Sequence, residues 1–277
     1  MPEILNQVTP LLITYNEEAN IDRTLAGLHW ARRIVVVDSG SSDNTLEILR
    51  SVPAVEIVHR PFRSFADQCN YGLSLIETAW CLSLDADHII SKAFLAEMKS
   101  LLTDVGDEIT AVVTPFRYMA YGKILRGTLL PSRINLMRPN GGKYHDDGHA
   151  HRFTPHGHSL AMREPILHDD RKSLSRWLDS QQRYLQQETI KLLNTENRQL
   201  CRSDRLRKQH VIAPFAVVII CLIWHRGIQD GWRGWFYAFQ RLYVETLLSL
   251  MLWEARQNGQ HLRPKTMADL PVRPLKA

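Results

Sequence analysis

Short apolar runs alternate with helical patterns through the first hundred residues. Four runs rich in apolar and β-branched residues predict strands at residues 10–14, 34–38, 55–59 and 79–85. Between them, apolar residues recur every three or four positions, as at Ile21, Leu25 and Leu28, which predicts amphipathic helices. The alternation predicts βαβ units, and therefore an α/β fold with a mostly parallel central sheet flanked by helices.

Further elements follow after residue 103, where the pattern changes. Residues 111–119 and 133–137 have the composition of strands. From Ser173 onward, apolar residues recur at helical spacing and predict a long amphipathic helix. Ser64 and Ser91 precede two earlier helical segments and are expected to be their N-caps. We expect the helix that begins at Ser173 to close a first domain of residues 1–200.

The remaining residues, 201–277, predict a second, helical region. A basic cluster precedes an apolar run of 14 residues, 211–224, and an aromatic helix is predicted at residues 235–253. Because a straight bilayer-spanning helix needs about 20 apolar residues, the run is better suited to an interfacial or re-entrant helix. Its tryptophan and tyrosine residues are types that settle at headgroup level. The alternative is a helical hairpin that packs on the first domain or on a second subunit.

The net charge of +5 conceals an unequal distribution. Lys and Arg minus Asp and Glu give 16 − 21 = −5 for residues 1–170 and 18 − 8 = +10 for residues 171–277. A cationic segment attracts nucleic acid or an anionic membrane. The aromatic and apolar content of the segment favours the membrane and argues against nucleic acid.

Cysteine usage and the N-terminus bear on the compartment. The four cysteines are far apart in the sequence, without a CxxC pair, and no charged segment followed by a long apolar stretch begins the chain. We therefore expect reduced thiols and a cytoplasmic protein.

Carboxylates follow two of the predicted strands. Asp38 ends the second strand, and Asp85 and Asp87 follow the fourth. Open parallel sheets bind ligands at the carboxyl ends of their strands, so these residues are expected at a binding edge. Two carboxylates one residue apart can hold a divalent cation that also binds phosphate oxygens. The pattern therefore indicates a nucleotide-diphosphate substrate.

These motifs are similar to those of a known family. The segments Thr14-Tyr15-Asn16-Glu17-Glu18, Asp38-Ser39-Gly40-Ser41-Ser42-Asp43-Asn44-Thr45 and Asp85-Ala86-Asp87 occur in the order and at the strand ends seen there. Residues 8 to about 105 thus resemble the nucleotide-binding half of a family 2 glycosyltransferase of the GT-A fold.

The resemblance implies roles for these residues. Thr14, Tyr15, Asn16 and Glu17, together with Asp38, would cradle the uridine. Asp85 would face the ribose or a divalent cation, Mn²⁺ or Mg²⁺, and Asp87 would ligate that cation. Asp43 is instead interpreted as a cap for the helix at Thr45, and Asp38 has the alternative of an Asx turn.

A narrower resemblance concerns one branch of the family. Residues 62–72 and the Leu-Asp-Ala-Asp turn resemble the branch that extends lipopolysaccharide cores and exopolysaccharides. That branch continues with Glu after the second Asp, whereas this chain has His88.

A general base must accept the proton of the acceptor hydroxyl. In the family it is expected within residues 144–152, where relatives often present a Glu-Asp or His-Glu pair that this chain lacks. We choose Asp147, with Asp146 and His149 as alternatives.

The resemblance also adds His168 to the metal or pyrophosphate shell. Arg171, just before the helix at Ser173, could contact the diphosphate, although a surface charge cluster is an equal alternative. A zinc site built on His149 and His151, or on His156 and His158, is less favoured, because no HExxH or cysteine spacing accompanies them.

The sequence thus predicts an inverting glycosyltransferase, with inversion implied by the resemblance alone. It would move a sugar from a UDP-sugar to a membrane-associated acceptor, either lipopolysaccharide core or a lipid-linked saccharide, in cell-envelope polysaccharide synthesis. We expect it at the cytoplasmic face of the inner membrane, peripheral or monotopic. The alternatives are a non-catalytic nucleotide-sugar-binding membrane protein and a sugar-nucleotide pyrophosphorylase-like enzyme. The latter would have a glycine-rich basic loop after the first strand, where this chain has an acidic one.

Overall fold

The computed structural model describes residues 4–147 and 150–258, which form two compact units. The first unit contains residues 4–119 and 130–171, and the second contains residues 120–129 and 172–258. The long helix after Ser173 falls in the second unit, whereas the sequence-based boundary lay at residue 200.

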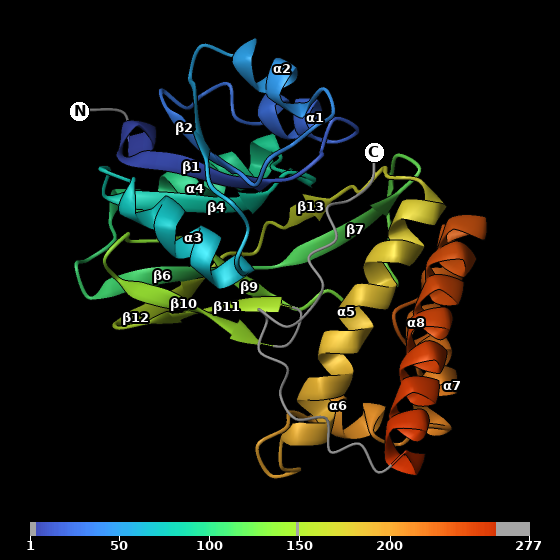
Figure 1. The fold of residues 1–277 in the computed structure, drawn as a ribbon. Coiled ribbons are helices and arrows are strands. Elements are labelled where there is room, and N and C mark those ends of the chain that lie inside the picture. Colours follow the sequence, from blue (N-terminus) through green and yellow to red (C-terminus); the bar gives the residue numbers. More distant parts are fainter. Residues whose placement is uncertain (1–3, 148–149, 259–277) are drawn as a thin grey trace. The chain divides into compact units, whose positions relative to one another are not determined.

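A seven-stranded sheet in the order β12-β6-β9-β4-β1-β2-β3 forms the centre of the first unit (Figure 1). Its strands are β1 (Val8–Thr14), β2 (Ile34–Asp38), β3 (Val55–His59), β4 (Trp80–Asp85), β6 (Ile109–Thr114), β9 (Arg133–Met137) and β12 (His158–Ala161). Strands β3, β2, β1 and β4 pair in parallel, as does β12 with β6, while β9 is antiparallel to β4 and β6. The predicted α/β fold with a mostly parallel sheet is confirmed.

Both faces of the sheet are covered by helices. The described helical segments of this unit are η1 (Ile4–Gln7), α1 (Ile21–Ala26), α2 (Thr45–Arg50), α3 (Phe65–Ser74) and α4 (Lys92–Thr103). Alternate residues of the strands point to opposite faces. In β1, Leu12 belongs to the core that includes Phe94 of α4, whereas Leu11 belongs to the core that includes Cys69 of α3. The near-continuous apolar strands are therefore buried on both sides.

The predicted helix caps are present. The hydroxyl of Ser64 accepts a hydrogen bond from the backbone N–H of Asp67 at 3.1 Å, and that of Ser91 accepts one from Phe94 at 3.0 Å. Each bond satisfies an N–H that has no partner within the helix.

One predicted strand, at residues 111–119, is divided in the structure. It forms β6 and β7 (Phe116–Ala120), separated by Pro115, which has no N–H to donate to a sheet. In a smaller sheet, β7 pairs in parallel with β13 (Ile166–His168), which is antiparallel to β5 (His88–Ile89). The register of the latter pair places His168 opposite His88.

Two further strands form a hairpin, β10 (Gly142–Asp147) and β11 (Ala150–Pro155). Helix α3 holds this hairpin through Asn70, which donates to the carbonyl of Tyr144 and accepts from its N–H, both at 2.9 Å. Asp147, chosen as general base, and its alternative Asp146 lie on β10.

The second unit is helical apart from β8 (Lys123–Ile124). Its helical segments are α5 (Leu174–Asn194), α6 (Arg202–Arg207), α7 (Ile212–Ile219), the π-helical η2 (Ile220–Trp224), η3 (Gly227–Asp230) and α8 (Trp232–Gln257). Leu185 and Leu192 of α5 pack with Leu248 of α8, which explains why α5 belongs to this unit. Among the described helices, none has the length and apolar character needed to cross a membrane.

Buried charges connect α5, α6 and α8. Arg207 lies 3.2 Å from Glu188 and 3.0 Å from Glu245, and Glu245 is also 3.0 Å from Arg241. Glu245 is 4% exposed, so its charge depends on these two guanidinium groups. Removing one partner of a buried ion pair leaves an uncompensated charge.

We therefore expect Glu245→Ala to destabilise the second unit by about 1–3 kcal/mol, because Arg207 keeps Glu188 as a partner while the bond to Arg241 is lost. Urea unfolding followed by circular dichroism measures the change. Glu254→Ala, which removes an exposed carboxylate on the same helix, is the matched control. Equal stability of the two variants would contradict a role of the ion pairs in holding these helices.

Candidate functional site

Two loops lie side by side at the carboxyl edge of the central sheet. The first follows β1 and the second follows β2, because parallel pairing places Thr14 opposite Asp38. The N–H of Asn16 donates to the hydroxyl of Ser41 at 2.9 Å, and the side-chain oxygen of Asn16 accepts from the N–H of Ser42 at 2.7 Å. The N–H of Glu17 donates to the hydroxyl of Thr45 at 2.7 Å. The two loops are thus locked to each other.

Within these loops the predicted donor-binding residues differ in exposure. Thr14 and Asn16 are buried, while the side chains of Tyr15 and Glu17 are partly exposed. Asn16 has φ of 54°, in the left-handed region that asparagine tolerates better than most residues. Tyr15 and Glu17 are therefore the predicted donor-binding side chains of this loop that solvent reaches.

Asp38 organises the second loop from within. It is 1% exposed, and one carboxylate oxygen accepts from the N–H groups of Gly40 and Ser41 at 2.8 and 2.9 Å. The other oxygen accepts from the hydroxyls of Thr14 at 3.1 Å and Ser41 at 2.5 Å. This is the geometry of the turn given as an alternative for Asp38. Gly40 has φ of 98°, which favours glycine there.

Asp43 bonds to the first residue of α2, although Asn44 and not Asp43 occupies the N-cap position predicted for it. Its carboxylate accepts from the backbone N–H of Thr45 at 3.0 Å and from the Thr45 hydroxyl at 2.5 Å. It also accepts from the N–H of Glu18 at 3.3 Å, which adds to the contact between the loops.

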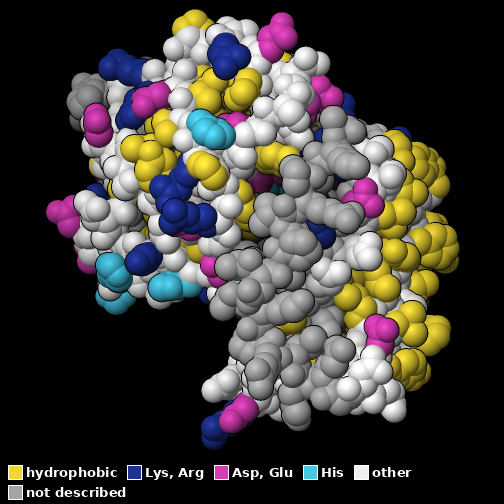
Figure 2. Space-filling model, in the orientation of Figure 1, with side chains coloured by type: hydrophobic (Ala, Val, Ile, Leu, Met, Phe, Trp, Pro, Cys, Tyr) yellow, Lys and Arg dark blue, Asp and Glu magenta, His cyan; other side chains and the backbone are white. Residues whose placement is uncertain are grey.

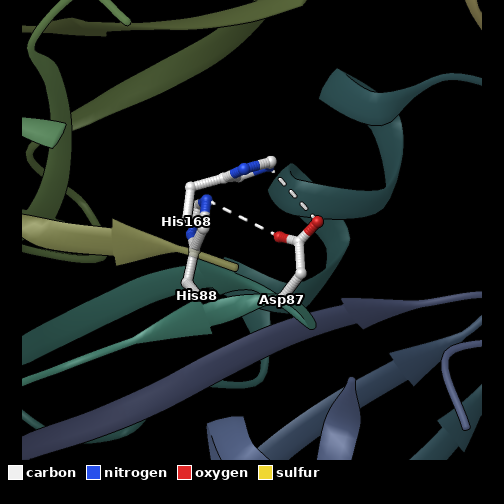
Figure 3. A group of neighbouring side chains, drawn as sticks. All are labelled: Asp87, His88 and His168. Atoms are coloured by element: carbon white, nitrogen blue, oxygen red, sulfur yellow. Dashed lines mark ion pairs between the residues drawn. The ribbon is translucent and has the colours of Figure 1, made fainter. Parts of the chain in front are cut away.

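A cluster of acidic and imidazole groups lies where β4 ends. Ligand atoms of Asp87, His88 and His168 lie within 4.8 Å of one another, a spacing that one metal ion can bridge. Nε2 of His168 is 3.3 Å from a carboxylate oxygen of Asp87, and Figure 3 shows both rings turned toward that carboxylate. The structure thus brings together Asp87 and His168, two of the predicted metal ligands.

Sequence reasoning missed His88, which was noted only as a departure from the branch pattern. The ring is 4% exposed, and its Nδ1 accepts a hydrogen bond from the backbone N–H of Asp85 at 2.9 Å. Since an N–H can only donate, Nδ1 is unprotonated and the neutral ring carries its proton on Nε2. That nitrogen lies 3.4 Å from the carboxylate of Asp85 and 3.9 Å from that of Asp87. In this tautomer the Nε2–H group of His88 faces the carboxylate of Asp85, and Nε2 has no lone pair to offer a metal.

The charges of the cluster follow from burial and proximity. Burial alone would lower the pKa of His168, but the carboxylate of Asp87 outweighs it and raises that pKa to about 9. Burial lowers the pKa of His88 against the opposing effect of Asp85. Burial would raise the pKa of Asp85, but nearby histidines, His88 foremost, lower it overall. At neutral pH, His168 is therefore the cationic imidazole of the cluster.

A small cavity of about 60 Å³ opens beside the cluster. It is lined by Asp85, His88, Phe116, Leu130, Pro131, Arg133 and His168. The volume corresponds to about two water molecules in the liquid, so it suits an ion with part of its hydration shell and is too small for a nucleotide.

The segment after β13 is tied to helix α1 and to the aspartate turn. The N–H of Asp169 donates to the carbonyl of Asp87 at 3.0 Å, and its carboxylate contacts Arg23 at 3.2 Å and Arg171 at 2.9 Å. Asn20 donates to the carboxylate of Asp170 at 3.1 Å and accepts from the N–H of Arg171 at 3.0 Å. Sequence reasoning missed Asn20, Arg23 and Asp169, because nothing local in the sequence links α1 to this segment.

The base candidates have different environments. Asp146 accepts from the N–H of Ala66 in the first turn of α3 at 3.2 Å, and Asp147 pairs with Arg152 at 3.1 Å. His149 lies outside the described residues. His151 stacks on Phe65 with ring centroids 5.7 Å apart. Burial lowers the pKa of His151, against the opposing effect of Asp85.

The chain is similar in sequence to a known protein family and to curated proteins. The family model described as Glycosyl transferase family 2 matches residues 11–168. The lipopolysaccharide core biosynthesis glycosyltransferase LpsC of Rhizobium meliloti (strain 1021) is 29% identical over 143 residues, 50% of this chain and 53% of the relative. An uncharacterized glycosyltransferase of Rickettsia bellii (strain RML369-C) is 29% identical over 123 residues, 44% of this chain and 39% of the relative.

Two solved structures are also similar. S. aureus TarS 1–349 in complex with UDP-GlcNAc aligns with 92% of this chain and 93% of its own, at 13% identity and a TM-score of 0.46. The mannosyltransferase PcManGT from Pyrobaculum calidifontis, in complex with GDP-Man and Mn²⁺, aligns with 88% of this chain and 87% of its own, at 16% identity and a TM-score of 0.47.

The matched part of this chain spans about half the length of LpsC. It spans 39% of the length of the Rickettsia bellii relative. The family match, by contrast, covers more than half of the chain and runs from β1 to His168, through both interlocked loops and the aspartate turn. The chain therefore belongs to glycosyl transferase family 2 and has the α/β GT-A fold.

Proposed function

We propose that the protein transfers a sugar from a UDP-sugar, with inversion, to a membrane-associated acceptor in cell-envelope polysaccharide synthesis. The observation that carries the proposal is the pairing of Asp87 with His168 at the carboxyl end of β4, beside the two locked loops. The similarity to LpsC, named for lipopolysaccharide core biosynthesis, supports a core saccharide or a lipid-linked saccharide as the acceptor. The site of action would be the cytoplasmic face of the inner membrane.

A divalent cation, Mn²⁺ or Mg²⁺, fits the oxygen and nitrogen ligands of the cluster. When bound, it would neutralise charge on the departing nucleoside diphosphate. Asp87 and His168 would hold it, with Asp85 facing either the cation or the ribose. His88 would orient the carboxylate of Asp85 through Nε2–H.

The donor and acceptor sides would use different parts of the first unit. Tyr15 and Glu17 would contact the uridine, and Asp38 would act through the loop that its carboxylate holds. Arg171, whose side chain is 49% exposed, would contact the diphosphate. On the acceptor side, Asp147 remains our choice of general base, with Asp146 and His149 as alternatives.

The function is tested first with Asp87→Asn. We expect this variant to fold and to release no measurable UDP when a panel of UDP-sugars is supplied with Mn²⁺ and a saccharide acceptor. Loss of a contact that merely orients a ligand costs about 10–100-fold, so loss of the ligand carboxylate is expected to exceed this. Asp107→Asn, which removes a fully exposed carboxylate of the same unit, is the control. Full turnover by Asp87→Asn would refute the metal role, and no UDP release by the unmodified protein from any UDP-sugar would refute the donor.

The raised pKa of His168 predicts a pH-dependent affinity for Mn²⁺. Below about 9 the ring is protonated, and a cation must displace that proton in order to bind. We expect the apparent dissociation constant to fall about tenfold per pH unit between about pH 7 and pH 8. Calorimetric titration measures the slope. His168→Gln should abolish it, whereas His145→Gln, at an exposed histidine, should preserve it.

The role of His88 can be tested separately from that of the proposed metal ligands, because its two ring nitrogens make different contacts. His88→Asn retains an acceptor for the N–H of Asp85 but loses the Nε2–H group. We expect it to fold normally and to bind Mn²⁺ about 10–100-fold more weakly. His88→Ala removes both functions and should also lower stability by about 1–3 kcal/mol, since the N–H of Asp85 loses its partner. Unchanged Mn²⁺ affinity in His88→Asn would show that the Nε2 contacts do not matter.

A further inference from the structure

Helix α7 and the η2 segment after it expose their largest apolar side chains. Ile212, Phe215, Ile219 and Ile223 recur every three or four positions and are 55%, 66%, 56% and 68% exposed. Trp224, which ends η2, is 81% exposed. A helix of a water-soluble protein normally turns such a stripe toward the core.

Helix α8 has the same inverted arrangement over almost its whole length. Its exposed large apolar residues are Trp232, Trp235, Phe239, Tyr243, Leu250 and Trp253, spaced by three, four or seven. Glu245 of this helix faces inward and is 4% exposed. A shallow groove of about 380 Å³ runs along this stripe between Phe239 and Leu250. The helix thus presents apolar side chains outward and keeps an ion pair inside.

We define the apolar face as these eleven side chains of α7, η2 and α8. Figure 2 shows hydrophobic side chains gathered over these helices. Exposed apolar surface of this extent marks a site that is covered in the functional state. The question is then what covers it.

The charges of the same segment favour a bilayer over a second copy of the chain. Residues 201–258 contain eight Lys and Arg against four Asp and Glu. Three of the four acids, Asp204, Asp230 and Glu245, are buried, so the segment shows solvent mainly its cations. Arg202, Arg205, Arg226 and Arg256 are exposed. An isologous interface between two copies would bring these cations together, whereas an anionic leaflet attracts them.

The side-chain types point the same way. Four of the seven tryptophans of the chain, Trp224, Trp232, Trp235 and Trp253, lie on the apolar face. Tryptophan settles at the level of lipid headgroups, where its ring is apolar and its N–H is hydrated. Helices with an apolar, aromatic face and flanking cations are the kind that lie in the plane of a membrane surface.

We propose that the apolar face inserts into the surface of an anionic bilayer, with α7 and α8 lying in the membrane plane. This inference deepens the proposed function, because it names the surface by which the enzyme would reach a membrane-borne acceptor. Its test needs neither donor nor acceptor. A failure would therefore leave sugar transfer itself untouched.

The test uses the full chain and flotation with vesicles of phosphatidylcholine, alone or mixed equally with phosphatidylglycerol. We expect binding to the mixed vesicles, weaker binding to phosphatidylcholine alone, and at least a tenfold loss of binding in the double variant Phe215→Ser/Ile223→Ser. The matched control is Leu160→Ser/Leu174→Ser, which removes two exposed leucines outside the apolar face and should bind as the unmodified protein does. Equal binding by the two double variants would overturn the proposal.

Two further measurements keep the result unambiguous. Brominated lipids should quench the tryptophan fluorescence of the unmodified protein, and an absence of quenching would overturn the proposal even if the double variant failed to fold. Light scattering without vesicles should give the same mass for the unmodified protein and Phe215→Ser/Ile223→Ser. A dimer that this double variant dissociates, together with no flotation, would assign the face to a second copy instead.

Discussion

The hydrogen bond from the backbone N–H of Asp85 to Nδ1 of His88 sets the properties of the cluster formed by Asp87, His88 and His168. It fixes the tautomer of a buried ring, so that the Nε2–H group faces two carboxylates that would otherwise repel each other. In this tautomer His88 has no nitrogen lone pair available for a cation. The imidazole that could ligate a cation beside Asp87 is therefore that of His168. A contact within four residues of sequence thus determines which histidine can bind a cation.

The elements of the fold could be predicted because their causes are local. Apolar runs defined β2, β3 and β9 with the bounds found in the structure, and Ser64 and Ser91 capped the helices expected of them. The division at Pro115 could also have been inferred, since proline interrupts a ladder.

The site was predictable only in part. Asp87 and His168 were named through resemblance, but their proximity depends on the register of β13 with β5, which no local pattern specifies. Asn20 and Asp169 were missed for the same reason, whereas His88, whose partner Asp85 is local, was missed because its burial is not visible in the sequence. Each acts on a partner that is either hidden by burial or distant in sequence, as with Asn20 and Asp170. A buried histidine directly after two aspartates was the available signal for His88.

The charge balance of the cluster indicates why a cation and a nucleoside diphosphate would bind together. With Asp85 and Asp87 ionised and His168 protonated, the three groups sum to −1, which repels a diphosphate. In the proposed function, exchange of the His168 proton for a divalent cation would bring the sum to zero, and the guanidinium of Arg133 beside the cavity would then make the local field positive. The raised pKa of His168 keeps the ring protonated near neutral pH, so its proton offsets part of the carboxylate charge until a cation would take its place. The arrangement makes diphosphate affinity depend on the cation, because each bound charge changes the field that the other meets.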